Sequence, residues 1–300
     1  MSWVNAVIQG ILLGGLYALF ACGLSLMFGV MKVINLAHGD LAVVAAYLAL
    51  GLVAITRSSA VSSVLHVPAG VSYAIVVPVF ALIGYVGQRT LLQSALNRGV
   101  LTTLLVTFGL SIVIENGLQQ FYSANSHTLN IGSLVSDSFG IGSQITIAYL
   151  DLAILAVAVV VLLGLQYFLS RSKNGRLIRA VADDREAAVL AGVDYRHVFG
   201  VAAAIAFGTV ALAGLAYGMY TQFSPTTGTD QLLLLFAFEA VVIGGLGSLW
   251  GTLAGGILLG IAQQIGAQIG SQDQFLASQL LFLLVLVVRP QGITSRRETS

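Results

Sequence analysis

The chain has 300 residues and a formal net charge of +1, and 57% of its residues are hydrophobic while only 8% are charged. Soluble globular proteins carry roughly 25% charged residues, because a surface that faces water requires them. The composition therefore excludes a soluble protein and indicates a membrane protein. The near-neutral charge gives no electrostatic footprint for nucleic acid, and the single cysteine excludes an internal disulfide.

The uncharged intervals between turn residues predict the membrane-spanning helices. A bilayer core of about 30 Å needs roughly 20 apolar residues per helix. We expect an all-α polytopic membrane protein with one transmembrane domain over 1–300, built from about 8–10 helices, some of them broken or re-entrant. The expected spans lie near 4–30, 39–56, 70–87, 100–122, 146–170, 198–220, 231–249, 252–271 and 275–289.

The basic residues predict the orientation of the chain in the membrane. Short loops rich in Lys and Arg stay on the cytoplasmic side. If the loop 171–197 lies inside, every Lys and Arg except Arg57 falls on the inner side. The N-terminus is then outside, the C-terminus is cytoplasmic, and the segment 123–143 forms the largest external loop.

Small residues recur at four-residue spacing, for example at Gly10 and Gly14 and again at Gly256 and Gly260. Small residues one helical turn apart allow helix backbones to approach closely in lipid. Each pair alone is typical of ordinary helix packing. Together they favour a compact bundle, as in transporters.

Two stretches interrupt the apolar pattern: residues 32–40, and residues 244–251 with four glycines. A break at membrane depth is tolerated only where the backbone is buried in protein or lines a wet cavity, and there it can face a substrate. Each stretch could instead be a turn at the inner face, with Asp40 as the charge in the first turn of a helix. Both interpretations stay open. The candidate pathway residues in the two stretches are Asn35, His38, Gly39, Asp40, Gly244, Gly245, Gly247 and Ser248.

Three carboxylates fall within the expected spans. Glu239 is the deepest, Glu115 shares a helix face with Gln119, and Asp151 lies near an outer end. A carboxylate at the bilayer centre costs on the order of 2.5–3.5 kcal/mol, so it usually faces the bundle interior or water. Glu239 is a further pathway candidate, and the alternative is a carboxyl that holds helices together through hydrogen bonds.

The chain lacks motifs for nucleotide and metal chemistry. Neither of its lysines, Lys32 and Lys173, stands in the Gly-Lys-Ser/Thr pattern of a phosphate-binding loop. Its histidines are scattered without the spacing of metal ligands. We therefore expect a protein that is not an enzyme and that binds no ATP, cofactor or metal itself.

The segment 171–197 is the most distinctive part of the chain. Ala, Leu and Glu dominate 185–191, and Gly192 stands where a helix would stop, which predicts a short amphipathic helix at the membrane face. Glu186-Ala187-Ala188, with Gly192 six residues after the glutamate, resembles the coupling motif of permease subunits of bacterial ABC importers. In that family the helix docks into a groove of the ATP-binding subunit.

Several blocks together resemble the high-affinity branched-chain amino acid permease family of the LivH type. The blocks are 10–29, 34–40, 175–192, 243–252 and 288–293, so the resemblance covers nearly the whole chain. It implies an inner-membrane permease for branched-chain or other neutral amino acids. The implied partners are a second related permease, two ATP-binding subunits that use the ATP, and a periplasmic substrate-binding protein.

The resemblance also assigns residues to roles. The implied coupling residues are Arg176, Arg179, Arg185, Glu186, Ala187, Ala188 and Gly192. Asp40 stands where glutamate is more familiar in the family, and Glu239 stands at a position associated with uncharged residues. A second hypothesis, from a different class of protein, is an ion-coupled transporter or channel for small polar solutes, including urea or amides. It would use Glu239 and Glu115 as proton sites.

Overall fold

The structure is a computed structural model that describes residues 3–57, 69–122, 125–129, 138–141, 145–224, 229–270 and 272–294. Its helices are α1 (Trp3–Met31), α2 (His38–Arg57), α4 (Ala69–Gly87), the π-helix η1 (Gln88–Leu92), α5 (Gln93–Leu96), α6 (Val100–Tyr122), α7 (Tyr149–Arg171), α8 (Lys173–Asp183), α9 (Arg185–Leu190), α10 (Tyr195–Tyr220), α11 (Thr229–Gly244), α12 (Leu249–Ile269) and α13 (Asp273–Val288). Two strands, β1 (Ser138–Ile141) and β2 (Ile145–Ala148), form an antiparallel pair.

In the described part of the chain, seven helices are long and apolar enough to cross a membrane. They are α1, α2, the continuous run of α4, η1 and α5, then α6, α7, α10 and α12. Two shorter apolar helices, α11 and α13, cover the remaining expected spans. The predicted class, an all-α polytopic membrane protein, is confirmed.

Two helix boundaries differ from the sequence prediction. The helix expected to stop at residue 87 continues to Leu96. Arg89 within it lies at the surface and donates a hydrogen bond to the Tyr85 hydroxyl one turn earlier. The helix expected to reach residue 249 stops at Gly244, because Gly245 adopts a φ of +106°, which a helix cannot continue. Charge spacing alone fixes neither boundary.

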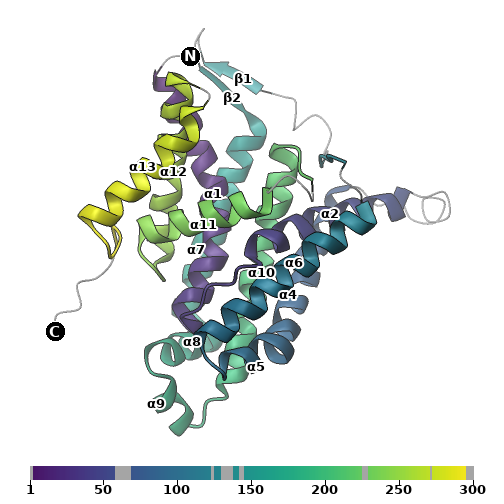
Figure 1. Ribbon diagram of the computed structural model, residues 1–300, viewed down its shortest axis with the longest axis vertical. Helices are drawn as coiled ribbons and strands as arrows, with labels where there is room; N and C mark the ends of the chain where they lie inside the picture. The colour runs from purple at the N-terminus through teal and green to yellow at the C-terminus, as the bar shows by residue number, and fades with distance from the viewer. Residues whose placement is uncertain are drawn as a thin grey trace.

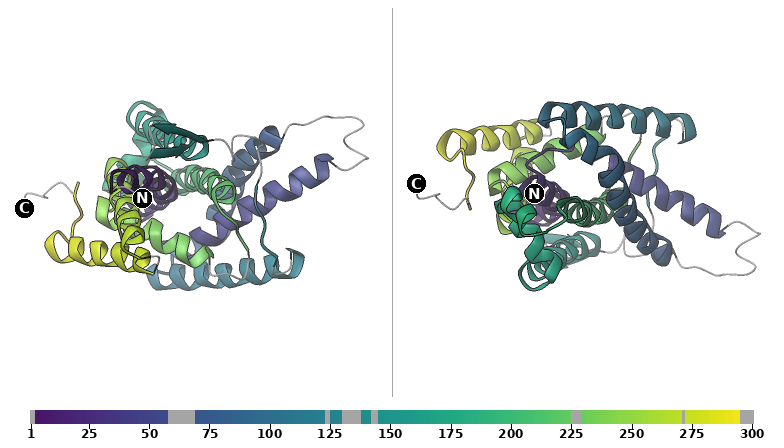
Figure 2. Two further views of the ribbon diagram at one scale, coloured as in Figure 1. Left: turned by 90° about the horizontal axis from the view of Figure 1, so that it is seen from above. Right: turned by 90° about the horizontal axis from the view of Figure 1, so that it is seen from below.

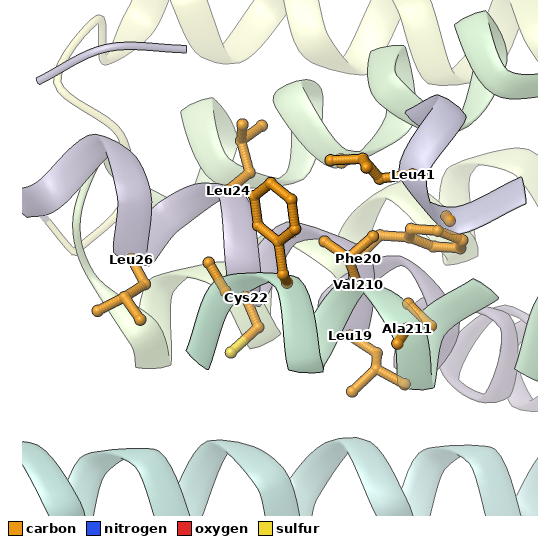
Figure 3. Packing of buried hydrophobic residues seen from close by; sticks show 14 of the residues in the cluster. Leu19, Phe20, Cys22, Leu24, Leu26, Leu41, Val210 and Ala211 are labelled. Carbon is orange, nitrogen blue, oxygen red and sulfur yellow. The ribbon is translucent and has the colours of Figure 1, made fainter. Parts of the chain in front are cut away.

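Helix α1 lies at the centre of the bundle. It contacts α12, α10, α7 and α11, and most of its residues are buried (Figures 1 and 2). Its side chains Leu19, Phe20 and Leu24 pack in one cluster with Leu41 of α2 and Val210 of α10 (Figure 3). A helix that is apolar on all sides is the expected sequence for this position.

Glycines bring α1 and α12 into backbone contact. A Cβ atom at Gly14 would lie 2.8 Å from the carbonyl oxygen of Gly256, and one at Gly256 would lie 2.7 Å from the backbone nitrogen of Ala18. Real Cβ atoms do not approach backbone atoms so closely. Any larger residue at these two positions would therefore force the two helices to shift. The four-residue glycine spacing therefore does act in helix packing here.

Two features of the ends of the bundle escaped the sequence prediction. The β1–β2 pair lies at the end where α1 begins, and α8 lies with α9 at the opposite end (Figure 1). Only 125–129 and 138–141 of the predicted external loop 123–143 are among the described residues. In that part, His127 and Phe223 exchange backbone hydrogen bonds of 2.9 and 3.0 Å, which tie the loop to the end of α10.

We predict that Gly256→Ala lowers the thermal stability of the purified protein in mild detergent. The new methyl group must push α1 and α12 apart, and overpacking of this kind costs about 1–3 kcal/mol. Gly109→Ala is the matched control, because a Cβ atom there meets nothing within 4 Å. Equal melting temperatures for both variants would contradict the close packing of α1 and α12.

Candidate functional site

The break between α1 and α2 is buried inside the bundle. The ring nitrogen Nε2 of His38, the first residue of α2, lies 3.0 Å from the carbonyl oxygen of Phe20 in the middle of α1. Because a helix rises 1.5 Å per residue, Phe20 lies about 16 Å before the end of α1 at Met31. The link 32–37 therefore runs back along α1, and α2 starts inside the bundle. The structure favours the re-entrant interpretation of this stretch.

Most polar side chains of the link and of the first turn of α2 are buried. Asn35, His38 and Asp40 are 1%, 0% and 3% exposed, and Gly39 is buried beside them. The Asn35 side-chain oxygen accepts a hydrogen bond of 3.1 Å from the backbone of Ala37. Two side-chain nitrogens, Asn35 Nδ2 and His38 Nδ1, have no hydrogen-bond partner in the structure. The four residues predicted here are thus brought together at the buried start of α2.

A small cavity, which we call the Asn35 cavity, lies beside the link. Residues of α1, the link, η1, α5 and α6 line it. The lining residues are Met27, Met31, Val33, Asn35, Gln88, Leu92, Leu96, Thr103 and Thr107. Gln88 is fully buried, and neither atom of its amide has a partner.

Sequence reasoning missed the polar residues that η1 and α6 contribute to this cavity, namely Gln88, Thr103 and Thr107. The available signal was weak, since one glutamine at the end of an apolar run and two threonines in another are common in membrane helices. The π-helix that turns Gln88 inward is a local irregularity that periodicity does not reveal.

Aromatic side chains pack around Tyr47 in the middle of α2. The ring of Tyr47 lies 4.5 Å from that of Tyr122, 5.0 Å from that of Phe223 and 5.7 Å from the His127 ring, measured between centroids. Tyr47 is 1% exposed. This aromatic cluster ties the middle of α2 to the end of α6 and to His127 and Phe223.

The second interrupted stretch lies at an end of the bundle. Gly244 and Gly245 are buried, but Gly247 is exposed, and a Cβ atom on it would lie 3.3 Å from Gly29 near the end of α1. The Ser248 hydroxyl accepts a hydrogen bond of 3.1 Å from the backbone of Gly251 and so caps α12. The hydroxyl of Thr294 donates to the carbonyl oxygen of Gly244. This placement favours the interpretation of a turn between α11 and α12.

Glu239 lies deep in the bundle and is paired with another helix. It is fully buried, and its carboxylate accepts a hydrogen bond from the side-chain amide of Gln279 in α13. Its second carboxylate oxygen has no partner in the structure. Glu115 lies partly buried on α6, and Asp151 lies in the first turn of α7. The contact with α13 favours a role for Glu239 in helix packing.

Helices α8 and α9 form an arm at the end of the bundle opposite the strands (Figure 1). The side chain of Asp184 accepts a hydrogen bond of 3.0 Å from the backbone of Ala187 and so caps α9. Gly192 follows with a φ of +84°, a conformation typical of the residue after a helix. The short helix predicted for 185–191 and its end before Gly192 are confirmed. The sequence did not predict α8.

The tip of the arm exposes apolar side chains. Leu190 is 89% exposed and Val189 is 45% exposed, while Ala188 is buried. Glu186 and Ala187, at the start of α9, are exposed as well. This mixture of apolar and acidic groups is typical of a surface that another protein covers.

The three arginines predicted in the arm have partners within the chain. Arg176 and Arg179 donate hydrogen bonds of 2.9 and 3.4 Å to the carbonyl oxygens of Arg171 and Ser170 at the end of α7. The guanidinium of Arg185 lies 3.9 Å from the centre of the Tyr195 ring at the start of α10. These contacts attach the arm to α7 and α10.

Residues 6–289 match the protein family described as branched-chain amino acid transport system / permease component. The chain belongs to this family. It is 31% identical to the high-affinity branched-chain amino acid transport system permease protein BraD of Pseudomonas aeruginosa, over 99% of this chain and 97% of that protein. It is 29% identical to LivH of Escherichia coli K12, which carries the same description, over the same shares.

A permease with a different substrate in its name is also similar. The fructose import permease protein FrcC of Rhizobium meliloti is 30% identical over 69% of this chain and 58% of that protein. The family match, the similar permeases and the apolar helices together identify the chain as a multi-pass permease component of a membrane transport system. They favour this function over the ion-coupled alternative.

We predict that Glu239→Leu destabilises the protein and Glu239→Gln does not. Leucine leaves the buried amide of Gln279 without an acceptor, which costs about 1–3 kcal/mol. Glutamine keeps an acceptor oxygen in the same place. Thermal unfolding in mild detergent measures both, and an equal loss in the two variants would show that the negative charge itself is required.

Proposed function

We propose that this chain forms the translocation pathway of an ABC importer for branched-chain or other neutral amino acids. The observation that carries the proposal is the match to BraD and LivH over nearly the full length of the chain. The implied partners are two ATP-binding subunits, a second related permease and a periplasmic substrate-binding protein. ATP is bound and hydrolysed by the partners, and this chain binds no cofactor.

The α8–α9 arm is the proposed contact with an ATP-binding subunit. Leu190 and Val189 would enter an apolar groove of that subunit, and Glu186 would meet a basic group at its rim. Because Arg185 attaches α9 to α10 and Arg176 attaches α8 to α7, a displacement of the arm is transmitted to both spans. Helix α10 contacts α1, α2 and α4, so it carries the displacement to the buried start of α2.

The same end of the bundle is proposed to face the cytoplasm. The arm lies there, and so does the end of α1, since the two are in contact (Figure 1). Basic residues are concentrated in the arm, and Lys32 directly follows α1. Short basic segments of this kind stay inside. The N-terminus would then be outside and the C-terminus inside, in the inner membrane of a bacterium.

Helix α6 is the proposed contact with the second permease. It runs along one edge of the bundle, and its buried residues are Thr103 and Thr107 (Figure 2). Its outer half exposes Asn116 and Gln120 among apolar side chains. Polar groups at membrane depth are costly against lipid, whereas a protein partner can hydrogen-bond to them.

We predict that Glu186→Lys and Leu190→Asp each weaken binding of the ATP-binding subunit. A loss of tenfold or more in affinity, about 1.4 kcal/mol or more, is expected because both side chains are exposed at the tip of the arm. Co-purification of the tagged permease from mild detergent, with the bound chains identified by mass spectrometry, measures the effect.

Lys173→Glu is the matched control for this experiment. It reverses a charge on the same arm, at the exposed start of α8 next to α7. It is expected to keep the ATP-binding subunit. If Glu186→Lys and Leu190→Asp retain this subunit with normal transport-coupled hydrolysis, the proposed coupling contact is wrong.

A further inference from the structure

The Asn35 cavity contains buried polar groups that the protein itself leaves unpaired. Both atoms of the Gln88 amide and the Nδ2 nitrogen of Asn35 lack hydrogen-bond partners, although the two residues are 0% and 1% exposed. A buried polar group without a partner is unfavourable, because it has lost its hydrogen bonds to water. Because both side chains line the same cavity, a molecule that enters it can satisfy them together.

The cavity is almost closed in this conformation. It holds about 10 Å³, which is room for a single water molecule. The walls include two elements that are not regular α-helix, namely the link 32–37 and the π-helix η1. Methionines Met27 and Met31 form part of the wall, and their flexible side chains adapt readily to a change of shape.

The unpaired atoms match the two ends of an amino acid backbone. The amide nitrogens of Asn35 and Gln88 can donate to a carboxylate, and the Gln88 amide oxygen can accept from an ammonium group. No lining residue carries a charge, so the site gives no preference for a basic or acidic side chain.

The remaining walls of the cavity are mainly apolar. Val33, Leu92 and Leu96 stand beside the two methionines and can surround an aliphatic side chain. Thr103 and Thr107 already donate their hydroxyl protons to backbone carbonyl oxygens of α6 and its preceding turn, and Thr107 also accepts from the backbone of Leu36. Thr107 therefore holds the link in place, while both atoms of the Gln88 amide and the Nδ2 nitrogen of Asn35 remain available to a passing molecule.

We propose that the Asn35 cavity is the closed form of a substrate site at the inner end of the pathway. In this site Gln88 and Asn35 bind the charged backbone groups of a neutral amino acid, while the methionine and leucine walls surround its side chain. The proposal rests on the proposed function, since it names the residues that a transported amino acid touches. Closure of the cavity between transport cycles leaves space for water alone and prevents a leak.

The single cysteine of the chain makes the proposal testable by labelling. Cys22 is buried in the core, and Cys22→Ala leaves this chain without cysteine. In that background Gln88→Cys places a thiol in the cavity. The complete complex in proteoliposomes is treated with a hydrophilic methanethiosulfonate reagent, with and without ATP and leucine-loaded binding protein. We expect labelling of this chain to become at least tenfold faster during turnover than without ATP.

Gln93→Cys in the same background is the matched control. Gln93 is 5% exposed, lies one turn further on in α5, and does not line the cavity. Its amide nitrogen donates to the side chain of Asn97. We expect its labelling to stay slow under all conditions, which separates opening of the cavity from general loosening of the helix.

A second variant tests recognition without a label. Gln88→Leu keeps the approximate size of the side chain but removes its amide, and we expect at least a tenfold loss of leucine uptake with the ATP-binding subunit still bound. If the Cys22→Ala complex shows ATP-dependent uptake while position 88 is never labelled and Gln88→Leu transports normally, the cavity holds a structural water only and the inference is overturned. If the Cys22→Ala complex and the unmodified complex show no ATP-dependent uptake, the proposed function fails instead.

Discussion

The close contact of α1 with α12 is the constraint on which the rest of the structure depends. Glycines at Gly14 and Gly256 remove the side chains that would separate the two backbones. In lipid there is no hydrophobic force between apolar helices, so close packing and buried hydrogen bonds must hold them together. Helices α12, α10 and α7 also contact α1, so its position in the bundle is fixed. The buried link to α2 folds back along it.

The re-entrant link places polar groups where an unbroken helix could not. His38 contacts the middle of α1, Asn35 lines the cavity beside the link, and Tyr47 packs in the aromatic cluster further along α2. Helix α10 contacts both this region and the α8–α9 arm. Helix α10 therefore connects the arm to the polar interior, as the proposed coupling to an ATP-binding subunit would require.

The sequence predicted the helical spans well because charge and apolar length determine them locally. Helix α6 has the bounds expected from its apolar run and the turn residues around it, Val100–Tyr122, and Gly192 marks the end of α9. The sequence does not decide the position of the link, since whether residues 32–40 form a surface turn or a re-entrant segment depends on contacts with Phe20 and Thr107, outside the segment itself. The same holds for Gln88, whose inward position depends on a π-helix, and for Glu239, whose partner Gln279 lies on another helix.

Uptake of radiolabelled leucine into proteoliposomes tests the central claim most directly. Two preparations are compared: the purified chain alone with an imposed proton gradient, and the chain reconstituted with its second permease, the ATP-binding subunits and the binding protein. We expect no uptake by the chain alone and ATP-dependent uptake by the full set. Gradient-driven uptake by the chain alone would contradict it, because the chain would then carry its own coupling site and the exposed arm would need no ATPase.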